Sequence, residues 1–131
     1  MTAATSAVVA GIGCRPGCEA AEVVALVRRA EREAGRRAGL LAVPAFRAAL
    51  PALLSAADEM ALPVATVTQD ALLAVQDRCP TRSERAAREH GIASVAEGCA
   101  LAAAGDGGRL ILPRIASAAV TCALAEVEEV R

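Results

Sequence analysis

The stretch VVAGIGCRPGC, Val8 to Cys18, decides how the rest of the chain is interpreted. Its small and β-branched apolar residues run into two glycines, which predicts a buried strand over residues 6–12 followed by a tight turn. A long helical pattern begins directly after this turn. Phosphate loops, dinucleotide loops, metal clips and plain structural turns all share this layout of a strand that opens through glycines onto a helix.

Two nucleotide-binding motifs fail at this loop. The Walker motif requires a lysine after its glycines, and the chain contains no lysine. The dinucleotide fingerprint that starts at Gly11 requires a third glycine where Pro16 stands, and the strand predicted at 40–46 has no acidic residue. What remains is an anion site, in which backbone N–H groups and the Arg15 guanidinium would hold a carboxylate or phosphate. The alternative is a structural turn that needs glycine for its conformation.

Outward from this loop, predicted strands alternate with predicted helices. Helices are expected at 19–37, 47–62, 69–75 and 94–104, with a polar helix or turn at 81–91. Further strands are expected at 40–46 and 64–68, with a closing pair at 109–113 and 118–127. Ser94 and Glu97 form an S-x-x-E pattern that predicts a capping box, and Gly105 is the expected left-handed terminator of the same helix. The fold class is therefore α/β: a single three-layer α/β/α domain over residues 1–131, with its core at about 6–127 and a mixed, mostly parallel sheet of about five strands.

Composition excludes several classes of function. The 14 basic residues are all arginine and are dispersed among 15 acidic ones, so the net charge is -1 and no basic face predicts nucleic-acid binding. The absence of lysine excludes Schiff-base chemistry. No apolar stretch approaches the length of a membrane span and no export signal is visible, so a cytoplasmic protein without a membrane partner is expected.

The cysteines and the single histidine give no convincing catalytic or metal motif. Cys14 and Cys18 are four residues apart, which is not the C-x-x-C spacing of redox pairs, and His90 is the only imidazole. We expect reduced thiols, no metal site and a helix-end role for His90, and we assign no catalytic residue. A thiol redox or small metal-binding protein that uses Cys14 and Cys18 remains an alternative.

Three blocks in order resemble the CobE / CbiG C-terminal domain family of cobalamin biosynthesis, over about Val8 to Val127. They are GIGCR after the first strand, the segment TRSERAAREHGIASVAEGCALAAAG, and the closing LILPR with AAVTCALAEV. The positions that match the family pattern are Gly11, Gly13, Cys14, Arg15, Gly17, Ser83, Gly91, Ser94, Val95, Glu97, Ala100, Leu101, Thr121 and Ala123. The chain departs from the pattern at Arg47 and Arg114, where lysines are usual, at Cys18, and around Ala49 and Leu50, where acidic residues are missing.

The resemblance implies a protein that binds an anionic corrin-ring intermediate of the precorrin or hydrogenobyrinic type. It would act as a carrier, or in a hydrolytic step such as the lactone opening of cobalt-precorrin-5A that releases acetaldehyde. No cofactor is implied, and an alternative role is a non-catalytic module that assists another enzyme of the pathway, with a homodimer unsurprising. The expected ligand-binding residues are Gly11, Gly13, Cys14, Arg15, Gly17, Ser94, Glu97, Arg114 and Thr121.

Overall fold

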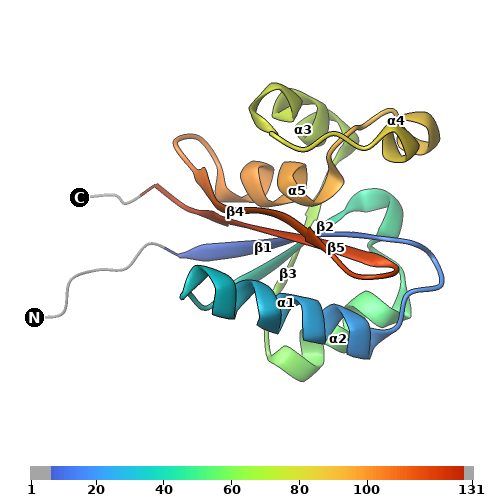
Figure 1. Cartoon of the computed structure of the whole chain (residues 1–131), viewed down its shortest axis with the longest axis vertical. Coiled ribbons are helices and arrows are strands. Elements are labelled where there is room, and N and C mark those ends of the chain that lie inside the picture. Colours follow the sequence, from blue (N-terminus) through green and yellow to red (C-terminus); the bar gives the residue numbers. More distant parts are fainter. Residues whose placement is uncertain (1–6, 129–131) are drawn as a thin grey trace, which may run out of the picture.

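The computed structural model describes residues 7–128 as one α/β domain (Figure 1). The strands are β1 (Val8–Cys14), β2 (Leu40–Pro44), β3 (Val64–Val67), β4 (Arg109–Ala116) and β5 (Val120–Glu126). The helices are α1 (Ala20–Ala34), α2 (Pro51–Met60), α3 (Gln69–Ala74), α4 (Glu84–His90) and α5 (Val95–Ala104), with 3-10 turns η1 (Ala45–Arg47) and η2 (Gln76–Arg78).

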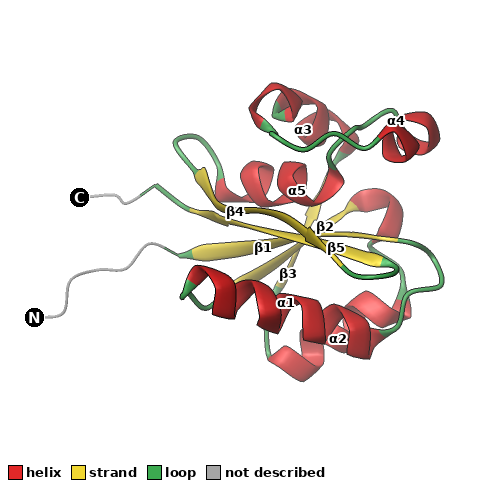
Figure 2. Cartoon of the chain, in the orientation of Figure 1, coloured by secondary structure: helices red, strands yellow, loops and turns green. Residues whose placement is uncertain are grey.

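The five strands form one mixed sheet in the order β3-β2-β1-β5-β4. β1 pairs in parallel with β2, and β2 with β3, whereas β5 is antiparallel to both of its neighbours, β1 and β4. Four strands therefore run in one direction and β5 alone runs against them. Helices cover both faces of the sheet (Figure 2), so the predicted three-layer domain with a mixed, mostly parallel sheet is confirmed.

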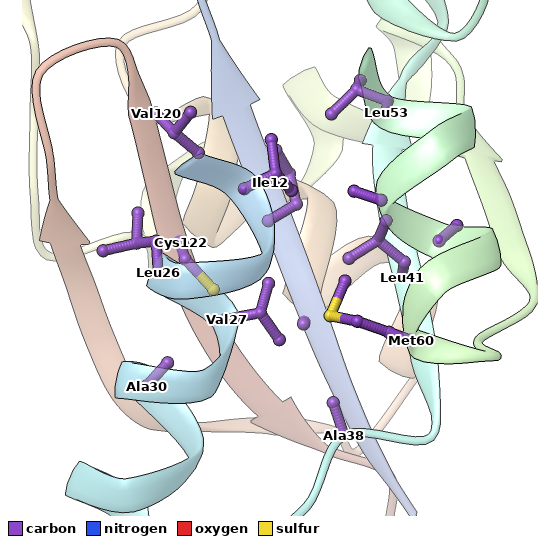
Figure 3. Packing of buried hydrophobic residues seen from close by; sticks show 14 of the residues in the cluster. Ile12, Leu26, Val27, Ala30, Ala38, Leu41, Leu53, Met60, Val120 and Cys122 are labelled. Carbon is purple, nitrogen blue, oxygen red and sulfur yellow. The ribbon is translucent and has the colours of Figure 1, made fainter. Parts of the chain in front are cut away.

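One face of the sheet carries the larger apolar core, against α1 and α2. Alternate residues of β1 point to this face because successive side chains of a strand lie on opposite sides. Ile12 and Leu41 from the sheet are fully buried there with Leu53 of α2 and Val27 of α1, as Figure 3 shows. α1 ends at Gly35, whose φ of 66° is a conformation that glycine adopts without steric cost.

The other face of the sheet is covered by α5, with α3 and α4 on the outer side of that helix (Figure 1). Gly11 of β1 lies directly beneath α5, and a Cβ placed on it would lie 2.1 Å from the carbonyl oxygen of Ala96 and 2.5 Å from the amide nitrogen of Ala100. Only glycine allows this approach, so Gly11 brings the backbone of α5 into contact with the central strand.

The predicted elements are all present, with shifted ends. Residues 45–47 form a 3-10 turn where strand and helix were expected to meet, and α2 begins at Pro51, which suits the first turn of a helix. Thr68 caps α3, since its hydroxyl accepts a hydrogen bond from the Ala71 N–H at 3.1 Å. The closing strands β4 and β5 form an antiparallel hairpin.

The predicted capping box at the start of α5 is wrong. The Ser94 side chain accepts no hydrogen bond from the helix, and its hydroxyl instead donates to Glu97 Oε1 at 2.7 Å. The Ser94 N–H donates to Gln76 Oε1 at 3.0 Å, so a side chain from outside the helix satisfies the group that Glu97 was expected to bind. Gly105 does have a positive φ of 81°, but its ψ of -173° places it outside the left-handed helical region expected of it.

Candidate functional site

A cleft of about 530 Å³ lies where the carboxyl ends of β1 and β2 meet the start of β5, the end of β4 and helix α4. This end of a sheet is where ligands of open α/β folds bind, at the point where the chain switches from one face to the other. The lining residues are Gly13, Cys14, Arg15, Pro16, Phe46, Arg47, Ser83, Arg85, Ala86, Glu89, His90, Ala93, Val95, Arg114, Ala116, Ser117, Ala118, Ala119, Val120 and Thr121.

The structure brings five of the predicted ligand-binding residues to this cleft. They are Gly13, Cys14, Arg15, Arg114 and Thr121, which come from both ends of the chain. The antiparallel pairing of β1 with β5 places Thr121 opposite Gly13, and the Thr121 hydroxyl donates to the Gly13 carbonyl at 3.3 Å. Gly13 and Thr121 therefore line the cleft as neighbours on two paired strands.

The other four predicted ligand-binding residues lie outside the lining of the cleft. Gly11 is buried beneath α5, and exposed Gly17 has no atom within 4 Å of the position its Cβ would take. Ser94 is 3% exposed and Glu97 is 0% exposed. The structure therefore gives Gly11, Ser94 and Glu97 a place in the packing behind the cleft.

Glu97 is a buried carboxylate with four hydrogen bonds. Its Oε1 accepts from the Thr81 N–H at 2.9 Å and from the Ser94 hydroxyl at 2.7 Å. Its Oε2 accepts from the Thr81 hydroxyl at 2.8 Å and from the Arg114 N–H at 3.0 Å. Burial by itself would raise the pKa of Glu97, but these hydrogen bonds, led by that of Arg114, outweigh it and hold the pKa below its usual range.

The charge of the cleft is dominated by arginine. Four guanidinium groups, from Arg15, Arg47, Arg85 and Arg114, face one carboxylate, Glu89. Arg85 donates to Glu89 at 3.1 Å, whereas the half-buried guanidinium of Arg114 forms no hydrogen bond or ion pair with any residue in 7–128. A chain with a net charge of -1 therefore concentrates positive charge at this cleft, which is the electrostatic environment an anionic ligand requires.

A pair of rings and a cation form the wall at the end of β2. The rings of Phe46 and His90 stack with their centroids 4.1 Å apart and an interplanar angle of 18°. The Arg47 guanidinium lies 5.1 Å from the centroid of the Phe46 ring, and Arg47 Nε donates to the Cys14 carbonyl at 3.0 Å. Gln69 holds the His90 carbonyl with a hydrogen bond of 2.9 Å, so this wall joins β1, β2, α3 and α4.

The tip of the β4–β5 hairpin forms the opposite wall and is fixed by α1. Glu22 Oε2 accepts hydrogen bonds from the Ser117 hydroxyl and from the Ala119 N–H, the latter at 2.7 Å. These two bonds hold the pKa of Glu22 below its usual range, with a further contribution from the positive charge of Arg15. The Arg15 N–H donates to the Ala119 carbonyl at 2.9 Å, which ties the loop after β1 to the same tip.

The Cys14 thiol lines the cleft but is not a thiolate. Burial, together with a hydrogen bond to Cys18, raises the pKa of Cys14 to about 12. A thiol with this pKa is protonated at neutral pH and is a weak nucleophile. Within residues 7–128, no three His, Cys, Asp or Glu side chains form a group that could hold a metal ion.

Several cleft residues escaped the sequence analysis. Phe46 and Ser117 stand in no block that resembles the family, and Arg85 lies inside the second block without matching a position of the family pattern. Helix α4 did carry a signal, because Ser83 matched the family pattern and caps this helix by accepting from the Ala86 N–H at 3.2 Å. None of the helices among residues 7–128 has the length and apolar character needed to span a bilayer.

Fold and cleft together define a class: single-domain α/β proteins with an arginine-lined cleft at the carboxyl end of a mixed sheet. Sequence comparison identifies the family within this class. The family described as "Cobalamin synthesis G C-terminus" matches residues 8–125, and the chain belongs to this family. A CobE protein from Sinorhizobium sp is 40% identical over 127 residues, which cover 95% of this chain and 82% of that protein.

Solved structures agree with this assignment. A crystal structure of CobE, described as a protein from the cobalamin (vitamin B12) biosynthetic pathway, superposes with a TM-score of 0.88 at 34% identity, covering 96% of this chain and 94% of that one. The cobalamin biosynthesis protein chiG from Agrobacterium tumefaciens str. C58 has a TM-score of 0.76 at 39% identity, covering 93% and 99% of the two chains. A cobalamin biosynthesis protein G homolog from Sulfolobus solfataricus shares the fold, with a TM-score of 0.72 at 23% identity; the match covers 94% of this chain and 37% of that one. The resemblance predicted from the three sequence blocks is confirmed, and the chain is a cobalamin biosynthesis protein of the CobE / CbiG C-terminal type.

Proposed function

We propose that the arginine-lined cleft binds a corrin-ring intermediate of cobalamin biosynthesis through its carboxylate side chains. The observation that carries this proposal is the presence of four arginines in one cleft of a chain whose net charge is -1. Corrin intermediates are flat and carry several acetate and propionate groups. Arginine pairs with carboxylates through two parallel hydrogen bonds, so several arginines around one cleft suit such a ligand.

The positions of the arginines support contacts on several sides of a ring. Arg15 follows β1, Arg47 follows β2, and Arg114 lies on β4. Because Arg47 uses its Nε on the Cys14 carbonyl, its two terminal nitrogens remain for a ligand. The stacked rings of Phe46 and His90 offer an apolar surface to the hydrocarbon part of the macrocycle.

The side chains of the cleft favour binding and transfer of the intermediate over hydrolysis. Cys14 is protonated at neutral pH, and the Arg85 hydrogen bond holds the pKa of Glu89 below its usual range. Glu97, the remaining acidic candidate, already accepts four hydrogen bonds in the interior. A general base needs both reach and a pKa near the working pH, which none of these three groups has. His90 also lines the cleft, with its Nε2 3.7 Å from Glu89 Oε2, and is the group that a hydrolytic role would have to use as its base. We propose the carrier role, and an assay for acetaldehyde release tests the hydrolytic alternative.

The test is a titration of the protein with hydrogenobyrinic acid, followed by the visible spectrum of the pigment and by calorimetry. We expect saturable binding in the micromolar range or tighter, weakened about tenfold to a hundredfold by Arg15→Ala and by Arg114→Ala, since a charged hydrogen bond contributes roughly 1.5–3 kcal/mol. The matched control is Arg37→Ala, which removes an exposed arginine outside the cleft and should leave the affinity unchanged.

The competing roles give different results in the same experiment. Absence of pigment binding to the wild-type protein would overturn the carrier role and favour a module that assists another enzyme of the pathway through protein contacts. Release of acetaldehyde from cobalt-precorrin-5A by the purified protein would replace the carrier role with the hydrolytic one.

A further inference from the structure

Glu97 joins strand β4 to the loop before α4, which both contribute to the cleft, although Glu97 itself does not line it. Its carboxylate accepts hydrogen bonds from Thr81, Ser94 and Arg114, which belong to three separate segments: the loop before α4, the start of α5 and strand β4. Glu97 is 0% exposed, so it makes these contacts from behind the cleft.

An irregularity in β4 lies at the point where the Arg114 N–H bonds to Glu97. The register between β4 and β5 shifts between Leu112 and Ile115, so the residues between them leave the regular ladder. The Arg114 N–H donates to Glu97 Oε2 at 3.0 Å, and the Arg114 side chain lines the cleft. The carboxylate of Glu97 thus fixes the backbone from which a cleft guanidinium extends.

The Thr81 contacts fix the position of helix α4. Thr81 precedes Ser83, the N-cap of α4, by two residues, and both its N–H and its hydroxyl donate to Glu97. α4 has no buried residue of its own, so its position depends on few contacts. Among them are the Thr81 bonds, the 2.6 Å hydrogen bond from the Ser83 N–H to the Ala93 carbonyl, and the stack of His90 on Phe46.

We infer that Glu97 is a positioning residue that sets the distance between Arg114 of β4 and helix α4, and so fixes the fit of the cleft to its ligand. This inference rests on the proposed function, because ligand affinity reports it. A carboxylate is required, since all four of its partners donate and an amide would replace two acceptor positions with donors. Glu97 does not touch the ligand in this proposal; it affects binding through the segments that it holds in place.

A double-mutant experiment separates positioning from general stability. The affinity for hydrogenobyrinic acid is measured for Glu97→Gln alone and combined with Arg114→Ala or with Arg15→Ala. We expect Glu97→Gln to weaken binding about tenfold in the wild type, only about threefold in the Arg114→Ala background, where the Thr81 contacts alone are lost to recognition, and again about tenfold in the Arg15→Ala background. Glu97 has no contact with Arg15, whose N–H bonds to Ala119, so those two losses should multiply.

The matched control is Glu31→Gln. Glu31 is also a buried carboxylate, 8% exposed, and accepts from the Ala38 N–H and from Arg28, each at 2.8 Å, on the α1 side of the sheet. Glu31→Gln should lower the melting temperature and leave the affinity unchanged. Equal affinity losses for the two Gln variants, or losses that multiply with Arg114→Ala, would overturn the inference.

A second pair of variants keeps the experiment decisive when Glu97→Gln does not fold. Thr81→Val and Ser94→Ala each remove one hydroxyl donor and retain the carboxylate. We expect Thr81→Val to weaken binding threefold or more because it loosens helix α4; full wild-type affinity in both variants would reject the positioning role. Failure of the proposed function is distinguished by the wild-type titration alone, since no pigment would then bind to any of the variants.

Discussion

The two faces of β1 differ in the size of the side chains they carry. Toward α1 and α2, the strand presents Val8, Ala10 and Ile12 to the larger apolar cluster. Toward α5 it presents Val9 and then Gly11 and Gly13, so the helix lies directly on the backbone. The side chains on the first face are buried in the apolar cluster, whereas the glycines on the second allow the close approach of α5, whose first residue, Val95, lines the cleft. Both faces therefore contribute to stability, the first through buried side chains and the second through the close packing of α5, and the second face also carries Gly13, which lines the cleft.

We expect Gly11→Val to have the largest effect on stability, because it places a large side chain on the face of β1 that has no room for one. The new Cβ would lie 2.1 Å from the Ala96 carbonyl oxygen, a backbone atom that cannot move without displacing α5. We expect a loss of about 4 kcal/mol or more in the free energy of unfolding, measured by urea denaturation. Gly17→Ala is the control and should change stability by less than about 0.5 kcal/mol, since nothing lies within 4 Å of its Cβ position. A stable Gly11→Val protein would show that α5 docks more loosely than described.

Leu53→Ala tests the contribution to stability of the sheet face that packs against α1 and α2. Leu53 is 0% exposed in the cluster under α2, and its truncation leaves a cavity. We expect a loss of about 2–5 kcal/mol in the free energy of unfolding, with unchanged affinity for hydrogenobyrinic acid at a temperature where the variant is folded. A matching loss of affinity would show that this face contributes to recognition as well.

Arg47→Ala should affect recognition more than folding. Arg47 links the Cys14 carbonyl to the Phe46 ring and lines the cleft. We expect binding of hydrogenobyrinic acid to weaken about tenfold, with a stability loss of about 1 kcal/mol, measured by calorimetry and urea denaturation. Arg47→Lys, which retains the charge, should stay within about threefold of the wild type, in keeping with the lysine that the family pattern has at this position. Equal losses in both variants would show that the planar guanidinium, and not the charge, is what the ligand needs.

Cys14→Ser should have the smallest effect and tests the thiol alternative. Burial raises the pKa of Cys14 to about 12, so its thiolate is roughly a thousandfold less populated than at the ordinary value of 9.0. We expect Cys14 of the native protein to resist iodoacetamide at pH 8, as followed by peptide mass spectrometry, and to react once the protein is unfolded in urea. Pigment affinity of Cys14→Ser and of Cys18→Ser should equal that of the wild type. Loss of binding in either variant would return the thiols to the site.

The fold could be predicted from the sequence because each helix and strand is determined largely by neighbouring residues. The continuous apolar run of β1, the amphipathic period of α1 and the glycine after it each depend on a few neighbouring residues. The site was only partly predictable because its groups meet through tertiary structure. The S-x-x-E pattern at Ser94 is the clearest case: it has the spacing of a cap, yet Glu97 binds Thr81 and Arg114, sixteen residues before it and seventeen after it. Arg85 joined the cleft for the same reason, since only the position of α4 brings it there.

The pairing of β1 with β5 also places the first and the last strand of residues 7–128 side by side. Val8, where the first strand begins, pairs with Glu126, where the last strand ends, and the cleft lies at the far end of the same two strands, beside Cys14 and Val120. Val8 and Glu126 therefore lie side by side at the end of the sheet opposite the cleft (Figure 1 shows β1 and β5 as neighbours). The same fold covers 37% of the longer Sulfolobus solfataricus chain. In the present chain the first and last strands of the sheet are neighbours, so the beginning of β1 and the end of β5 are brought together at one edge of the domain while their other ends line the cleft.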